Sequence, residues 1–546
     1  MPSPALHLRA PLLWLLLPLM AGLAAARVWS PPAGLWLFVV GASCAAIAAI
    51  AAAFLNRPKI WMACLVLSAG LGGYVLLHAR YPGLNGWETR PPREITVTLE
   101  VWRTFPVAPQ ARSLNGLATI TATGADDREL IGRRVYYSAI RRISVPPQRS
   151  GRYLIQGVIE PLARDETPDG FNDYLQNLGI RHQLTRARIL LEAQPPGRLP
   201  LFFSRTQGRL EELLGHGLER HPAIIPLYRA MLLGDKAVLS GEQQNAFMRS
   251  GTFHIFCIAG LHVGVIAAAL RAGLLLLRVP RRPAVVLTLL LLWVYVRITG
   301  ANTPAERAFL MITFWLVAQV FRWPGNGLAA LTTAALVTLL LDPLELFSTG
   351  FQMSYTVVLT LVVLGAPLAE QWLAAWRPFA YRPKPDWRWY HHAVNRSGRG
   401  LLGAMAICWA SFLASTPSSI GYFHLFSPGS LVANLVIVPL ASLAITAGFL
   451  SILGGLAGLH AVCALFNSAA ALVILTMDWL VRHAATVPGF YFPARFTSGW
   501  MAPAALVALT AVLLAGVAGR WSRRYGGYWP PVIVLGLLII FGVKFG

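Results

Sequence analysis

Long apolar stretches recur along most of the chain and are separated by short polar segments. Most are close to twenty residues long, enough for a helix to cross the roughly 30 Å hydrocarbon layer of a bilayer. The last run and the run at 327–341 are shorter, so either could be re-entrant or interfacial. The pattern predicts a polytopic α-helical membrane protein with spans at 11–27, 33–55, 59–78, 254–279, 283–299, 305–322, 327–341, 352–375, 400–418, 430–455, 461–482, 500–519 and 529–545.

One region, from about 90 to 200, breaks this pattern. Its apolar and polar residues alternate with the period of two that half-buried strands show, and Gly, Pro and Asp separate the runs. Five strands with a helix, "FNDYLQNLG", before the last one fit a β-rich, OB-fold-like soluble domain, and a β-barrel without a ligand fits equally well. The predicted strands are 94–102, 116–122, 133–140, 152–160 and 182–192.

The segment "LFFSRTQGRLEELLGHGLERH" (201–221) has apolar residues at helical spacing and charges on its other face, which predicts an interfacial helix. The chain then divides into four parts. They are an N-terminal transmembrane hairpin bundle of about three spans (1–85), the OB-like domain (90–200), amphipathic or interfacial helices (201–253) and a transmembrane domain (254–546).

Composition and charge fit this architecture. The chain is 56% hydrophobic and 13% charged, whereas soluble domains are about a quarter charged. Its net charge is +23, and the loops 278–282, 377–399 and 520–524 are strongly basic. By the positive-inside rule these loops, and with them the N-terminus, lie in the cytoplasm, and the 90–200 domain lies outside the cell membrane. Membrane topology thus accounts for most of the positive charge without a polyanion.

The sequence nominates no catalytic centre. Five cysteines (44, 64, 257, 408 and 463) fall in or beside apolar spans, so no disulfide framework is expected in the soluble domain. No Cys/His pair has zinc-site spacing, and Walker A, HExxH and G-x-S-x-G motifs are absent. We therefore expect no metal, no cofactor and no enzyme activity.

Ionisable groups at membrane depth cost about 2.5–3.5 kcal/mol on insertion scales, so they normally have partners or line a wet cavity. The stretch 232–268 carries two histidines inside an apolar run. Eight residues apart on one helix, they lie about 12 Å apart along its axis and cannot share a metal unless the helix breaks near Gly260. Neutral histidines bonded between helices and a polar pore wall are both open, with two glycines allowing close backbone approach. The candidates here are Asp235, His254, Gly260, His262 and Gly264.

Three later stretches also carry polar residues: "VRITGANTPAERAFLM" (296–311), "DPLELFSTGFQMSY" (342–355) and "FHLFSPGSLVANLVIVPLASL" (423–443). The Arg307 side chain could reach the membrane interface or form an ion pair, for example with Glu306. Alternatively, it could line a path for anions. Broken backbone at membrane depth is tolerated only against protein or a water-filled cavity. Four such segments suggest an internal polar pathway, with Arg307, Asp342, Gln352, Ser354 and Asn434 as further candidates.

These four stretches, in this order, resemble the competence domain of the ComEC family, the DNA-uptake channels of naturally transformable bacteria. The family signature reads approximately G-D…L…F…G-x-x-H-x-x-A-I-S-G-L-H-x-G, and "LLGDKAVLSGEQQNAFMRSGTFHIFCIAGLHVGVIAA" (232–268) matches it. The resemblance implies an inner-membrane channel that passes single-stranded DNA into the cytoplasm. The partners it implies are the lipid bilayer, a separate DNA receptor, a nuclease and a cytoplasmic motor, and a homo-oligomer is compatible with it.

The chain departs from the family pattern in three ways. The H-x-H-x-D-H motif of a metallo-β-lactamase-like domain is absent, so we expect any nuclease to be another protein. The soluble domain lacks the cysteines that form a disulfide in some relatives. The family's I-S-G is Ile258-Ala259-Gly260, which removes a hydroxyl group from the expected path.

Two other functions stay open. A transporter of a small or lipid-like solute could use the same bundle, and saturable solute uptake with a shallow salt dependence would favour it. A membrane enzyme is the third reading, and loss of activity with intact transport after mutation of one His or Asp would favour it.

Overall fold

The structure is a computed structural model. It describes residues 10–29, 34–81, 91–105, 113–140, 147–163, 171–219, 221–234, 239–256, 258, 260–300, 303–321, 326–519 and 528–545. The chain forms two compact units. We call Trp14–Arg209 with Leu336–Ser348 the barrel unit, and Met1–Leu13 with Leu210–Ala335 and Thr349–Gly546 the bundle unit.

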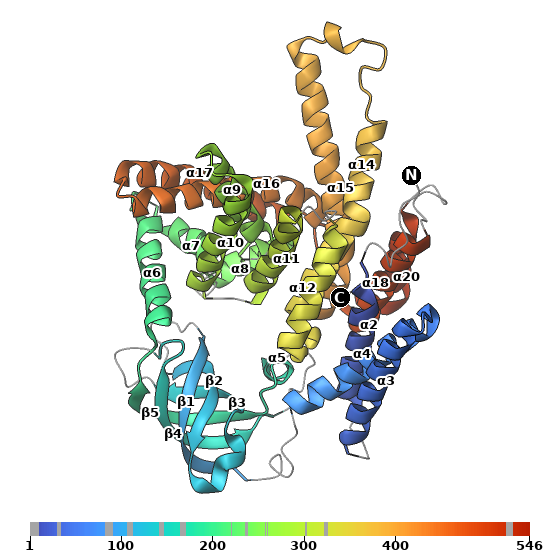
Figure 1. The fold of residues 1–546 in the computed structure, drawn as a ribbon. Helices are drawn as coiled ribbons and strands as arrows, with labels where there is room; N and C mark the ends of the chain where they lie inside the picture. Colours follow the sequence, from blue (N-terminus) through green and yellow to red (C-terminus); the bar gives the residue numbers. More distant parts are fainter. Residues whose placement is uncertain are drawn as a thin grey trace. The chain divides into compact units, whose positions relative to one another are not determined.

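The barrel unit begins with three apolar helices, α2 (Leu13–Val28), α3 (Trp36–Phe54) and α4 (Pro58–Arg80) (Figure 1). Helices α3 and α4 pack along each other as a hairpin. Asn56, with a φ of 55°, lies in the tight turn between them, and Pro58 occupies the first turn of α4, where its missing N–H costs nothing. The predicted N-terminal helices are thus confirmed.

A closed five-stranded barrel follows, with strand order β1-β2-β3-β5-β4. β3 and β5 pair in parallel, and the other neighbours are antiparallel. Every predicted strand is confirmed to within three residues at each end. The strands are β1 (Arg93–Thr104), β2 (Ser113–Thr123), β3 (Arg134–Ile140), β4 (Arg152–Pro161) and β5 (His182–Gln194).

Alternation of side chains explains the barrel. In β1, Val97, Leu99 and Val101 are buried and their neighbours are more exposed, as the two-residue period of a strand requires. Their side chains join a core with Ile120, Tyr137 and other inward residues. The short helix α5 (Phe171–Asn177) places Leu175 in a second, smaller core with Leu117, Leu162 and Ile180. The predicted helix before the last strand is thus present.

The bundle unit is almost entirely helical. Helix α6 (Arg198–Gly215) leads into it, as the helical spacing after residue 200 predicted. The helices that follow are α7 (Ile225–Leu233), α8 (Gly241–Arg249), α9 (Gly260–Leu276), α10 (Arg281–Ile298), α11 (Thr303–Val320), α12 (Gly327–Leu341), α13 (Thr349–Thr360), α14 (Ala366–Ala375), α15 (Trp389–Phe423), α16 (Ser430–Leu456), α17 (His460–Ala484), α18 (Met501–Gly519) and α20 (Trp529–Gly542). The part of α12 from Leu336 on belongs to the barrel unit.

Helix packing within the bundle unit brings distant segments together. Helices α9, α10 and α11 contact one another, and α9 also packs against α16 (Figure 1). Helix α13 continues through a π-helical turn (Leu361–Gly365) into α14, and α15 packs along this run. A small sheet of β6 (Leu425–Phe426), β7 (Phe492–Phe496) and β8 (Val543–Phe545) joins three segments far apart in sequence.

Seven helical segments in the described part of the chain are long and apolar enough to cross a membrane: Trp36–Phe54, Pro58–Arg80, Thr349–Ala375, Trp389–Phe423, Ser430–Leu456, His460–Ala484 and Met501–Ala518. Five shorter apolar helices accompany them. The chain is a multi-pass membrane protein. Helices α10 and α11 form where spans were predicted, and both carry charged residues, including Arg297 and Arg307.

One predicted span is wrong in its first part. Instead of a continuous helix from 254, a 3-10 turn covers Phe253–Phe256 and α9 begins only at Gly260. Glycine is a poor residue for the middle of a helix because its unfolded backbone is so free, and it favours such a boundary. His254 and His262 therefore lie on two different elements.

Candidate functional site

The two histidines differ in their surroundings. His262, on the first turn of α9, is 1% exposed, and neither ring nitrogen has a hydrogen-bond partner among the described residues. His254 lies on the 3-10 turn and is exposed. The backbone of Ile255 and the imidazole of His254 lie close to this buried ring. The nearest backbone partners of the two rings are Gly251 for His254 and Ile255 for His262, both in the segment just before α9.

A turn just before His254 is tightly built. Gly251 has a φ of 71°, and a Cβ there would come 2.6 Å from Cβ of Ser430 at the start of α16. The hydroxyl groups of Ser250 and Thr252 share a hydrogen bond of 2.7 Å, and Ser427 Oγ donates to the Arg249 carbonyl at 3.2 Å. This junction holds the segment before α9 against the segment before α16. Gly251 was not among the predicted residues, although its place between Ser and Thr just before the apolar run was visible.

Two predicted glycines do not act as expected. Gly260 is exposed at the start of α9, and a Cβ at Gly260 or Gly264 would have no atom within 4 Å in the described structure. The prediction that these glycines allow close approach of another helix is therefore wrong. Close approach occurs instead at Gly350, where a Cβ would lie 2.9 Å from Nη2 of Arg307.

Arg307 is buried, with 3% of its surface exposed. It lies on α11, and its guanidinium reaches Gly350 at the start of α13, against which α11 packs. The side chain does not snorkel to the surface. Its neighbour Glu306 lies 3.6 Å from Arg297 in an ion pair. A cation is thus held inside the bundle between two helices.

The other bundle candidates lie on helices next to these. Gln352 Oε1, on α13, accepts a hydrogen bond of 2.7 Å from the hydroxyl of Tyr422 on α15. Ser354, on the same helix, is half-buried. Asn434, on α16, has a buried Oδ1 without a hydrogen-bond partner among the described residues. Because α9 packs on α11 and α16, and α13 on α11 and α15, these polar groups are distributed over adjoining helices.

Asp342 belongs to the barrel unit and not with the other candidates. Its carboxylate accepts hydrogen bonds from Tyr81 Oη at 2.9 Å, Arg134 Nη2 at 3.0 Å and the backbone N–H of Leu344 at 3.1 Å. The last bond caps a short 3-10 helix, Pro343–Phe347. Burial raises the pKa of the Tyr81 phenol above its ordinary value, so this hydroxyl stays a donor. Asp342 thus anchors the end of α12 to the barrel.

Arg134 completes this anchor. Its Nη1 donates to the Leu178 carbonyl at 3.0 Å, and its guanidinium lies over the rings of Tyr81 and Trp102 at 5.5 and 5.6 Å. The partners of Asp342 could not be read from the sequence, because Arg134 and Tyr81 are 208 and 261 residues away.

The barrel also carries a set of aromatic side chains, which we call the aromatic surface: Phe105, Tyr136, Phe171 and Tyr174, with Arg103. Phe171 and Tyr174 are 49% and 39% exposed. Arg103 lies over the Phe105 ring at 5.5 Å and donates to Tyr174 Oη at 2.8 Å. A cation held among exposed rings suits a ligand with flat faces and negative charge.

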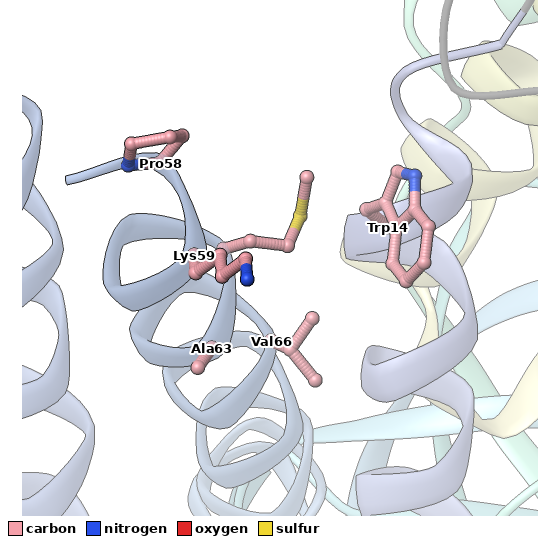
Figure 2. A pocket seen from close by; sticks show the side chains of 6 residues that line it. Trp14, Pro58, Lys59, Ala63 and Val66 are labelled. Carbon is pink, nitrogen blue, oxygen red and sulfur yellow. The ribbon is translucent and has the colours of Figure 1, made fainter. Parts of the chain in front are cut away.

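Two further features complete the description. An open apolar groove lies between α2 and α4, lined by Trp14, Pro58, Lys59, Met62, Ala63 and Val66 (Figure 2). None of the predicted site residues lines it. No group of three His, Cys, Asp or Glu side chains within the described ranges could hold a metal ion. Asp235 lies outside the described residues.

A known protein family matches the part of the chain that contains these helices. The family model "Competence protein" matches residues 231–521, more than half of the chain. ComE operon protein 3 of Bacillus subtilis is 28% identical over 222 residues, and Recombination protein 2 of Haemophilus influenzae is 25% identical over 224 residues. These alignments cover 41% and 39% of this chain, but only 25% and 26% of the relatives.

Competence protein ComA of Neisseria gonorrhoeae is 31% identical over 153 residues, which is 25% of this chain and 21% of that protein. No solved structure gives a significant match. The family match contains Gly251, His262, Arg307, Gln352 and Asn434, and so includes all the bundle contacts described above. The chain therefore belongs to the ComEC family of competence proteins.

Proposed function

We propose that this protein is the inner-membrane channel component that passes single-stranded DNA into the cytoplasm during natural transformation. The observation that carries the proposal is the family match over the bundle helices whose interior holds Arg307, His262 and Asn434. A strand of phosphates needs a wet path with some cationic guidance, because charge in the hydrocarbon layer is costly. A buried cation and buried polar side chains on adjoining helices support the proposal.

The proposal treats the chain as a channel without enzyme activity. A DNA receptor, a nuclease and a cytoplasmic motor are then proposed to be separate proteins. The bilayer surrounds the helices of both units, and several copies of the chain are compatible with the proposal.

The barrel is proposed to be an OB-like domain outside the membrane, with the N-terminus in the cytoplasm. Five strands closed into a barrel are the architecture that OB-folds use for oligonucleotides. The aromatic surface supplies stacking faces next to Arg103, as single-strand binding requires. Single cysteines placed at Arg186 in the barrel and at Lys384, in a background without native cysteines, test this orientation. The barrel site should react with a membrane-impermeant thiol reagent in intact cells, and the Lys384 site only after lysis.

The direct test is uptake of labelled DNA by cells that lack the gene, restored with wild type, with His262→Ala or with His221→Ala. His221 is exposed and serves as the matched control. We expect deletion to abolish internalisation, wild type and His221→Ala to restore it, and His262→Ala to restore it poorly. Normal internalisation by the deletion strain would refute the proposal and make transport of a small or lipid-like solute the working hypothesis.

A further inference from the structure

The helices α14 and α15 form a hairpin whose far end stands clear of the other helices of the bundle unit (Figure 1). We call residues 377–399 the hairpin tip. At its base the two arms pack closely: a Cβ at Gly398 would come 2.3 Å from the ring of Trp376. Arg399 Nη1 also donates to the Leu373 carbonyl at 3.3 Å.

The hairpin tip has a defined internal structure. The Phe379 ring meets the rings of Trp387 and His391 edge to face, at 5.6 and 4.6 Å between centroids. Trp387 Nε1 donates to the Arg382 carbonyl at 3.1 Å, and the Arg388 backbone N–H donates to His391 Nδ1 at 3.0 Å. Prolines 378, 383 and 385 restrict the backbone further. The tip is therefore an ordered element with a small core of its own.

Around this core the tip exposes aromatic rings and positive charge. Tyr381 is fully exposed, and Trp389 and Tyr390 are 80% and 40% exposed. Asp386 is the one acidic residue in the segment. All of its basic side chains are exposed: Arg377, Arg382, Lys384, Arg388, Arg396 and Arg399. The positive-inside rule explains the basic residues but gives no reason for large rings exposed on an ordered tip.

The length of α15 separates two kinds of partner. Its apolar part begins at Leu401, and Trp389 lies twelve residues earlier in the same helix. At 1.5 Å per residue this is about 18 Å of helix, whereas the headgroup layer adds only about 5–7 Å beyond the hydrocarbon on each side. Trp389 and its neighbour Tyr390 therefore lie beyond the layer where interfacial tryptophans are found.

We propose that the hairpin tip binds single-stranded nucleic acid and receives the strand as it leaves the channel on the cytoplasmic side. This rests on the proposed function. Exposed rings give stacking faces that accept any base, and the surrounding guanidinium and ammonium groups hold the phosphates. Tyr390 stacks on His391 of the ordered core and meets Trp389 edge to face, so these two rings are positioned before binding and lose less conformational entropy.

The test uses the full chain in nanodiscs of neutral lipid and the binding of a fluorescent oligothymidylate, with Tyr174→Ala in every sample to weaken the barrel contribution. Combining Tyr381→Ala with Trp389→Ala should weaken binding about 5- to 150-fold for each base that loses its stacking partner. Trp389→Phe keeps a ring and should restore most of the loss at that position. Trp500→Ala removes an exposed tryptophan elsewhere in the bundle unit and should change nothing.

Charge gives a second readout. Replacing Arg377, Lys384 and Arg396 by Gln should lower the slope of log affinity against log salt by about 2, since each single-strand phosphate contact contributes about 0.7. Hydrogen exchange locates the partner, because the oligonucleotide should protect residues 377–399. Protection of this segment by anionic lipid without oligonucleotide would assign the tip to the membrane surface and overturn the proposal.

Different results would contradict the channel function and the binding of nucleic acid by the hairpin tip. If deletion abolishes DNA uptake but the tip variants bind with unchanged affinity and salt slope, only the tip proposal is lost. If the deletion strain takes up DNA normally, the channel function is lost, whatever the tip binds in the nanodisc.

Discussion

Among the motif residues, some pack tightly against neighbouring atoms and others have no atom close to them in the part of the chain that the structure describes. Gly350 and Gly264 make a matched pair, since one lies against a buried guanidinium and the other against no atom within 4 Å in the described structure. Gly350→Ala should displace the guanidinium of Arg307, the flexible end of that side chain, and cost about 1 kcal/mol of stability. Gly264→Ala should be neutral or stabilise by up to about 1 kcal/mol, because alanine favours a helix interior. Thermal unfolding of the purified protein measures both, and equal effects would contradict the contact with Arg307.

The carboxylate of Asp342 gives a second residue-scale prediction. Asp342→Asn keeps a capping oxygen but leaves Arg134 without its counter-charge. Because both side chains are more than a quarter exposed, we expect a loss of only about 1 kcal/mol. Asp342→Ala also removes the cap and should cost about 1 kcal/mol more. The control is Arg152→Gln, which breaks the more exposed pair with Glu100 in the same barrel and should have less effect than either.

At the scale of elements, a buried polar network connects α17 to three other helices. Asn467, 0% exposed, donates to the carbonyls of Leu213 and His216 at 2.8 Å. Its Oδ1 accepts from Tyr228 Oη at 3.0 Å and from Ser451 Oγ at 2.6 Å. These four bonds use both N–H groups and both oxygen lone pairs of the Asn467 amide. They fix α17 against α6, α7 and α16.

Asn467→Ala should therefore be among the most damaging changes in the bundle. It leaves buried donors and acceptors without partners, at a cost of about 2–4 kcal/mol. Ser468→Ala, at the next position, removes only an exposed hydroxyl bonded to its own helix and should cost below about 0.5 kcal/mol. Denaturation in detergent compares the two, and a small effect of Asn467→Ala would show that water replaces the lost partners.

Over the whole molecule, local patterns predicted elements well and long-range partners poorly. The barrel strands follow from alternation, and the helices of the bundle from apolar runs, since both signals lie within a few neighbouring residues. The break before α9 was considered only as an exception, because Gly260 was read as a packing position in a continuous helix. The anchor of Asp342 and the contact between Arg307 and Gly350 depend on tertiary packing, which no local pattern contains.

The barrel's strand order has a consequence for synthesis. β5 lies between β3 and β4, so the four strands made first form an open sheet with two free edges. Free edges can pair with other chains, which makes them a risk for aggregation. The ribosome must complete residues 182–194 before one strand can cover both edges at once. A chain that stalls after β4 would leave an aggregation-prone intermediate with two free strand edges. The thirteen residues of β5 close the same sheet into a barrel.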